Sequence, residues 1–292
     1  MCSKLWALCL LAVAGNAQVH VQGVEAAAAA GGISQDLGDQ INNAFSTCSD
    51  GCIVRVDAGT YRFSTPIVLN RPGLQLQGSG GRATKLVFTG TFGPAIDLRM
   101  NPFAIDTHTL IQGLSVELEN PNTTALLTGD VTSAIYRDLW IDCENVSNTH
   151  GIFIYLTNGW FERNLFDSVD IKYCTNDLTL QLDQAATSNS FGYNKFMQVG
   201  LNVGDNQTGI VIGTNTMLYH SLMNFNVNMD TSSQNAFMRV WGTSHANTYQ
   251  IVGEAGAATV GISVEKGGNW EDGQLTRGGV VYLDHMNNLG IQ

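Results

Sequence analysis

The stretch Val54-Arg-Val-Asp-Ala-Gly-Thr-Tyr-Arg-Phe63 opens a series of short strands, and Leu74-Gln-Leu-Gln-Gly-Ser-Gly80 continues it. Apolar residues alternate with polar ones in both segments, which is typical of β-strands, whereas a helix repeats them every three or four residues. Glycine and small polar residues that tolerate tight turns fill the intervals between such segments. Because the alternation returns along the rest of the chain, we predict a molecule built from strands and turns.

Two apolar patterns recur with one shared period. The first, apolar-x-x-apolar-x-apolar, begins at positions separated by 25, 30, 30, 26 and 27 residues. These positions are Ile111, Tyr136, Phe166, Phe196, Leu222 and Tyr249. The second pattern, apolar-x-apolar, recurs from Ile96 to Ile262 about every 28 residues. A strand pattern with a period of about 20 to 50 residues indicates a solenoid, so we predict an all-β parallel β-helix of roughly eight to nine coils.

A leucine-rich repeat has a similar period and is the alternative solenoid. Its Asn or Cys position would fall at Glu144, Cys174 and Gly204, of which only Cys174 fits. No amphipathic helix is visible between the apolar patterns. The parallel β-helix is therefore the better interpretation.

The N-terminal region divides into three parts. Residues 1–17 contain Lys4, an apolar run and a small-x-small exit, which predicts a secretory signal and hence an extracellular or periplasmic protein. Residues 18–32 are interpreted as an Ala/Gly-rich linker, and residues 33–292 as the β-helix domain. Within that domain, residues 34–46 carry apolar side chains at helical spacing and predict a helix that caps the first coil.

The charge and the cysteines limit the partners that we expect. The formal net charge of -11 argues against nucleic acid and anionic membrane surfaces as partners, because basic faces bind both. Four cysteines remain after the predicted signal, and they suit an oxidising compartment. We predict the disulfides Cys48–Cys52, across one turn, and Cys143–Cys174, between adjacent coils. No cysteine or histidine pair has zinc spacing, so we expect no metal site of that kind.

Aligning the coils by their period places polar side chains on one outward strip. Asp138, Trp140 and Asp142 alternate with the inward residues of one strand. The aligned neighbours in the flanking coils are Glu117 on one side, and Asp170, Lys172, Asn202 and Asn226 on the other. Sugars stack on aromatic rings while carboxylates and amides bind their hydroxyl groups. We therefore predict substrate contacts at Trp140, Asn202 and Asn226.

The carboxylates on this strip are the catalytic candidates. Asp138 and Asp170 are diagonal neighbours at roughly 7 to 8 Å, which suits an inverting glycoside hydrolase. Glu117 and Asp142 are adjacent at roughly 5 Å, which suits a retaining pair, a bound cation or one carboxyl of raised pKa. Lys172, next to Asp142, could instead be a base for β-elimination. Solubilising surface is the alternative for each of these acids.

Two residues near the second apolar pattern are further candidates. Tyr155 points outward and could contact substrate or pack under a loop. His150, which precedes Gly151, could have a catalytic or binding role.

The segment from Ile53 to Gly80 resembles the opening coil of the pectate-lyase-like superfamily, specifically its rhamnogalacturonase/epimerase-type domain. The Asp57-Ala-Gly-Thr-Tyr61 turn, with Asp57 in place of the usual proline, and the Leu-x-Leu-x-Gly-x-Gly strand carry the resemblance. It implies a right-handed β-helix that acts outside the cell on polysaccharide, with Ca²⁺ as a possible cofactor if the activity is a lyase. The polygalacturonase signatures are missing apart from Thr149-His-Gly151, so no catalytic residue carries over.

The hypothesis that follows is a secreted polysaccharide-degrading enzyme, with a hydrolase favoured because the strip is acidic and no Arg/Lys cluster is visible to hold a uronate. The alternatives are a lyase or epimerase acting on a uronate polymer, and a non-catalytic β-helix that binds glycan or builds a surface structure. We expect no cofactor for a hydrolase. The sequence does not indicate the oligomeric state.

Overall fold

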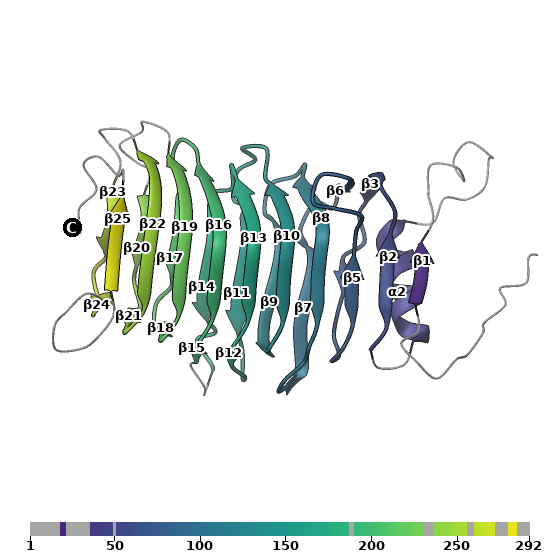
Figure 1. Cartoon of the computed structure of the whole chain (residues 1–292), viewed down its shortest axis with the longest axis horizontal. Coiled ribbons are helices and arrows are strands. Elements are labelled where there is room, and N and C mark those ends of the chain that lie inside the picture. Colours follow the sequence, from purple (N-terminus) through teal and green to yellow (C-terminus); the bar gives the residue numbers. More distant parts are fainter. Residues whose placement is uncertain are drawn as a thin grey trace, which may run out of the picture.

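The computed structural model describes residues 18–21, 36–48, 51–186, 190–229, 236–255, 260–271 and 280–284. The chain winds into an elongated parallel β-helix with a single short helix close to one end of the described part (Figure 1). The fold is the predicted all-β parallel solenoid, with about seven turns instead of eight to nine. The chain makes fewer turns than predicted because the helix, and an irregularity between Arg99 and Ala104, use residues without adding a turn.

Three sheets run along the solenoid. The first sheet has twelve strands. They are β1 (Gln18–Val21), β2 (Ile53–Val56), β3 (Gly59–Phe63), β5 (Gln75–Gln77), β6 (Thr84–Phe88), β8 (Leu110–Leu118), β10 (Ile135–Asp142), β13 (Leu165–Lys172), β16 (Lys195–Val203), β19 (Leu222–Met229), β22 (Thr248–Ala255) and β25 (Val280–Asp284).

The second sheet has nine strands and the third has four. The second sheet consists of β4 (Ile67–Val68), β7 (Gly93–Ala104), β9 (Thr123–Thr132), β11 (His150–Leu156), β12 (Phe161–Glu162), β14 (Asn176–Leu182), β17 (Thr208–Ile212), β20 (Ala236–Val240) and β23 (Val260–Val264). The third sheet consists of β15 (Phe191–Gly192), β18 (Met217–Tyr219), β21 (Thr243–His245) and β24 (Asn269–Trp270). In Figure 1 the second sheet lies behind the first, and the third runs along the lower edge.

The first apolar pattern stacks coil on coil, as predicted. Tyr136 pairs with Phe166, and Phe166 pairs with Phe196, in parallel register. Their rings are stacked, with centroids 4.3 Å apart for the first pair and 4.6 Å for the second. Each of these side chains is almost fully buried. Burial of such rings supplies a large hydrophobic contribution, and it requires successive coils to stay in step.

A backbone irregularity explains the unequal spacing within this pattern. Gly113, Asp138, Ser168 and Gln198 occupy equivalent positions in successive coils, and each has φ between 49° and 66°. This left-handed conformation inserts one extra residue between two inward-facing positions. For that reason Tyr136 and Leu139 are both buried although two residues separate them.

A ladder of buried polar side chains braces one corner. The backbone N–H of Ala134 donates to Asn164, and that of Asn164 donates to Asn194, at 2.9 and 3.0 Å. The backbone N–H of Asn194 donates to Ser221, and that of Ser221 donates to Asn247. Counting by the sequence period would place His220 at the ladder position that Ser221 occupies. His220 is exposed and lies outside the ladder. A side chain that satisfies a buried backbone donor in each coil stabilises the corner.

The N-terminal end is capped by α2 (Leu37–Thr47), close to the predicted 34–46, and Asp36 caps it by accepting from the Gly38 N–H at 2.9 Å. The helix buries Leu37, Ile41 and Phe45 against the first coil. The predicted linker 18–32 is corrected at its start, because Gln18–Val21 alternates and pairs with β2 as β1. The predicted signal, residues 1–17, lies outside the described residues. No helix among the described residues is long and apolar enough to cross a membrane.

Both predicted disulfides are present. Cys48 bonds Cys52 across the turn that follows α2. Cys143 bonds Cys174 one coil further along, so that two successive windings are covalently linked. The latter pair is fully buried in the core.

Candidate functional site

The strand register gathers the predicted strip on the outward face of the first sheet. Trp140 lies opposite Asp170 in the next coil, and Asp142 lies opposite Lys172. On the other side Asp142 lies opposite Glu117. Parallel strands with this register hold equivalent side chains about 4.8 Å apart. Trp140 and its neighbours therefore share one flank of the solenoid.

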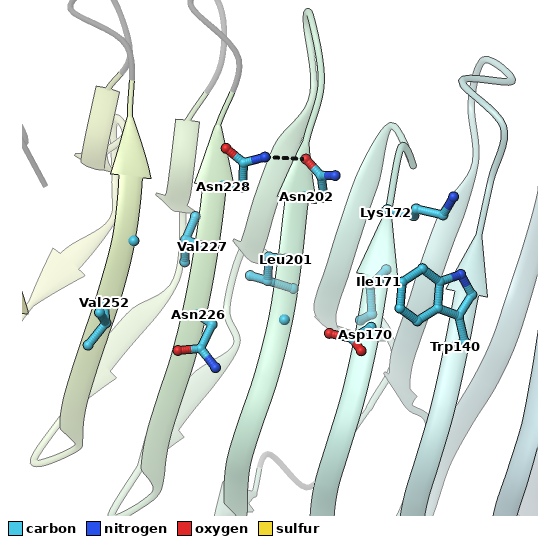
Figure 2. A pocket seen from close by; sticks show the side chains of 12 residues that line it. Trp140, Asp170, Ile171, Lys172, Leu201, Asn202, Asn226, Val227, Asn228 and Val252 are labelled. Atoms are coloured by element: carbon cyan, nitrogen blue, oxygen red, sulfur yellow. Dashed lines mark hydrogen bonds between the residues drawn. The ribbon is translucent and has the colours of Figure 1, made fainter. Parts of the chain in front are cut away.

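A groove of about 380 Å³ runs along this flank across five coils (Figure 2). Its lining begins at Trp140 and Asp170 and continues over Asn202 and Asn226 to Val252. Gly200 and Gly253 also line it. Because glycine has no side chain, a neighbouring carboxylate can lie over Gly200, and the Val227 backbone can approach Gly253 closely.

Asp170 lies over one of these glycines. A Cβ added at Gly200 would fall 2.0 Å from the Asp170 Oδ1 atom, so the missing side chain makes room for the carboxylate. Partial burial raises the pKa of Asp170 above its ordinary value, and the charge of Asp138 raises it further. Arg82 opposes both effects and lowers this pKa. Desolvation and a nearby anion both favour the protonated carboxylic acid.

Asp138 has a different environment. Its carboxylate accepts a hydrogen bond from the backbone N–H of Gly81 at 3.0 Å. Its left-handed φ of 49° sets it in the backbone irregularity beside the strip. The two carboxyl groups thus have different surroundings, because Asp138 bonds the Gly81 N–H whereas Asp170 lies over Gly200.

Trp140 separates the groove from a second cavity of about 280 Å³, which is lined by Arg82, Lys85, Glu117 and Asp142 among others. The Arg82 guanidinium lies 4.3 Å from the centroid of the Trp140 ring, and the Lys172 ammonium lies 5.6 Å from it. These cation–π contacts hold the half-buried indole in place. Sequence reasoning missed Arg82, because its loop precedes the regular repeats and no period relates it to Trp140.

Three of the candidate catalytic residues belong to ion pairs. Lys172 pairs with Asp142, and Lys85 pairs with Glu117. The Glu144 N–H also donates to Asp142 at 3.0 Å, and the negative charge of Asp142 raises the pKa of the Glu144 carboxyl. Paired and partly buried charges of this kind stabilise one another, so these groups are poorly suited to act as a catalytic acid, base or nucleophile. Among the described residues, no cluster of three or more histidine, cysteine or acidic side chains could hold a metal ion.

Tyr155 and His150 lie on β11 of the second sheet, away from the groove. His150 stacks on Phe153, with centroids 4.7 Å apart, and its Nδ1 atom lies 2.9 Å from the Thr179 hydroxyl. Burial lowers the pKa of His150 to about 4, so the ring is neutral at neutral pH. The Tyr155 hydroxyl donates to the Asp183 carboxylate. Neither residue can contact a ligand that is bound beside Trp140.

No family model matches the chain, and no curated protein matches it. A solved structure of ORF18 of Geobacillus virus E2 is 14% identical over 88% of this chain and 57% of its own length, with a TM-score of 0.47. The chain therefore spans little more than half of that protein. Pectin methylesterase from carrot is 9% identical over 96% of this chain and 89% of its own, with a TM-score of 0.46.

Alginate lyase from Paenibacillus sp. str. FPU-7 is 12% identical over 86% of this chain and 97% of its own, with a TM-score of 0.38. Identities of this size bear on the fold alone. The parallel β-helix itself is established by the strand register of this chain.

Proposed function

We propose that this protein is a polysaccharide-modifying enzyme that hydrolyses a glycosidic bond in the groove beside Trp140. The observation that carries the proposal is the position of Asp170, which lies over Gly200 with a raised pKa, beside an aromatic ring and the second carboxylate Asp138. Glycosidases commonly use a pair of carboxyl groups, of which the general acid has a raised pKa.

In the proposed reaction Asp170 donates its proton to the glycosidic oxygen as the bond to the anomeric carbon breaks. Asp138 takes a proton from a water molecule whose oxygen attacks that carbon. The sum is hydrolysis, and exchange with solvent restores both acids. A diagonal separation of roughly 7 to 8 Å between neighbouring strands leaves room for this water and implies inversion at the anomeric carbon.

The remaining groove residues would bind the polymer. The Trp140 ring can stack on the apolar face of a sugar. Asn202, Asn226 and Asn228 present amides along the axis, and Asn228 Nδ2 donates to Asn202 Oδ1 at 3.3 Å. A glycan parallel to the solenoid axis would pass from the aromatic end to the amide end. Such a substrate is extracellular, which agrees with the two disulfides and with the proposed secretion.

The experiment that tests this proposal is a panel of neutral and acidic polysaccharides with two readouts, the release of reducing ends and the absorbance of unsaturated products. A hydrolase releases reducing ends without unsaturation. Unsaturated products would instead indicate a lyase, and we disfavour that activity because Lys172, its candidate base, is paired with Asp142. Release of neither product from any polymer would contradict the enzymatic proposal.

One observation favours a second candidate, a β-helix that binds glycan without cleaving it. Every residue that lines the main groove belongs to a strand, from β10 to β22, so no described loop walls this part of the surface. Catalytic sites usually exclude water more completely than such an open face. Binding of a polymer to the wild-type chain without any product would support this alternative.

A further inference from the structure

The second sheet carries a cavity of its own, of about 400 Å³. Tyr155, Gln181, Leu182, Asp183 and Gln184 line it. These residues belong to β11, to β14 and to the turn that follows β14. None of them lines the groove beside Trp140, so the two hollows are separate features of the molecule.

Hydrogen bonds from two coils fix the position of the carboxylate in this cavity. The Tyr155 hydroxyl donates to Asp183 Oδ2, and the Ala185 N–H donates to Asp183 Oδ1 at 2.8 Å. The backbone N–H of Asp183 donates to the Leu156 carbonyl, also at 2.8 Å. These bonds hold Asp183 ionised, and they lower the pKa of its carboxyl. Each carboxylate oxygen can still accept a further hydrogen bond.

Glycines flank the cavity along the solenoid axis. In the preceding coil Gly129 is adjacent to Tyr155, and in the following coil a Cβ added at Gly213 would fall 1.9 Å from Gln181 Oε1. The Gln181 side chain therefore lies across a position without a side chain, and its Nε2 atom donates to the Leu182 carbonyl at 2.8 Å. These two glycines let the Tyr155 backbone and the Gln181 side chain approach the neighbouring coils closely, which fixes both residues at the cavity.

The lining has the chemistry of a neutral sugar site. An aromatic ring, a carboxylate and two amides match the apolar face and the hydroxyl groups of a pyranose. The lining contains no lysine or arginine, and the neighbouring Arg99 is paired with Asp97 through bonds of 2.8 and 2.6 Å. An anionic ligand would meet Asp183 without a free cation to balance it. From these observations, we propose that the Tyr155 cavity is a second, non-catalytic binding site for an uncharged sugar unit of a polysaccharide.

Such a site serves a different purpose from the groove beside Trp140. A polymer held on two sheets is bound at two points, and linked binding raises overall affinity without new contacts at either point. The proposal does not depend on catalysis, because it concerns binding alone.

Affinity electrophoresis through native gels tests the proposal, with hydroxyethylcellulose, arabinoxylan and glucomannan as the probes. The parent for the experiment is Trp140→Ala, which removes the ring of the first groove. We expect this variant to be retarded by at least one probe. Adding Tyr155→Ala should then weaken the apparent affinity about fivefold to tenfold, the usual contribution of a stacked ring.

Two further variants guard against a change in folding. Gln184→Ala alters an exposed side chain at the rim, and it should also weaken retardation without changing the melting temperature. Tyr193→Ala removes an exposed tyrosine that directly follows β15 and stacks on His220, and it should leave retardation unchanged. The proposal is overturned if Trp140→Ala migrates freely through all three probes, or if Tyr155→Ala and Gln184→Ala are retarded as strongly as their parent.

Discussion

The raised pKa of Asp170 depends on the immediate neighbours of this residue. Burial beside the strands and the anion of Asp138 favour its proton, whereas Arg82 favours its loss. Gly200 gives the carboxylate the space that it occupies. The same side chain on a flat, solvated strand would be an ordinary surface acid. The proposed reaction therefore depends on three residues besides the one that carries the proton.

Arg82→Met should move the pH dependence of the proposed hydrolysis. Because the guanidinium lowers the pKa of Asp170, its removal raises that pKa, and the general acid then stays protonated at higher pH. We expect the alkaline limb of the kcat/KM profile to shift upward. Arg163→Met, which changes an exposed arginine outside the groove, is the control. A downward shift, or no shift, would show that Arg82 does not act on the catalytic acid.

Gly200→Ala should displace the carboxylate without removing it. The new methyl group would overlap with Asp170 Oδ1, and the Asp170 side chain must rotate away. A misplacement of about 1 Å can cost about a hundredfold in rate. We expect a loss of that order in kcat with a nearly unchanged melting temperature. Full activity in this variant would mean that the position of Asp170 over Gly200 is unimportant.

At the scale of the elements, the strands were predictable from the sequence and the loops were not. Trp140 and Asp170 could be placed side by side because they are one period apart on parallel strands. The three-residue step from Tyr136 to Leu139 reflects the irregularity at Asp138, which was not predicted from the sequence. By contrast, the contact of Arg82 with Trp140 joins a loop to a strand, and nothing periodic in the sequence encodes it.

The ion pairs illustrate a second limit. Register alone put Glu117, Asp142 and Lys172 together, but it could not show which charges neutralise one another. The structure pairs Lys172 with Asp142, and it pairs Glu117 with Lys85, a residue outside the predicted strip. Tyr155 and His150 were predicted near the second apolar pattern, and their strand belongs to the second sheet, apart from Trp140.

Strand β14 contains a buried acid that should limit stability. Asp177 is fully buried, and neither of its carboxylate oxygens makes a hydrogen bond of good geometry. Burial raises its pKa well above the ordinary value, although the nearby Cys174 backbone opposes the shift. The unfolded chain ionises this group above about pH 4, whereas the folded chain must keep it neutral. The free energy of unfolding therefore falls as pH rises from there to the pKa of the folded state.

Asp177→Asn removes this titration, and it should stabilise the protein at neutral pH by on the order of 1 kcal/mol. At about pH 3 the wild-type carboxyl is protonated in both the folded and the unfolded chain, so the gain in stability should vanish. Urea unfolding at the two pH values measures the difference, with the exposed Asp205→Asn as a control. A variant that is less stable than the wild type at both pH values would contradict this assignment.

The two disulfides should contribute unequally. Cys143 and Cys174 close a loop with a sequence separation of 31, and Cys48 and Cys52 close one of 4. In the chain-entropy model the longer loop contributes about 3 to 4 kcal/mol, and the shorter loop contributes less. Denaturant unfolding of Cys143→Ala/Cys174→Ala and Cys48→Ala/Cys52→Ala compares them. A larger loss from the second double variant would indicate that the first coil, and not the central coils, limits stability.

Across the whole molecule, the stacked coils bring residues that are one period apart in the sequence side by side on a continuous surface. Side chains from five successive coils line one groove, and a second cavity lies on another sheet. Each coil contacts mainly its neighbours, so a groove can lengthen along the axis without any change in the core. A polymer that lies along the axis matches this geometry better than a compact ligand does.

The most direct test of the central claim is the initial rate of reducing-end release by Asp170→Asn, measured on a polymer that the wild type cleaves. The amide cannot donate the proton, and loss of a general acid typically costs about a hundredfold to ten-thousandfold in rate. We predict a loss in that range, with Asp205→Asn unaffected. A wild-type rate in Asp170→Asn would show that the bond is cleaved elsewhere, and the proposed site would be wrong.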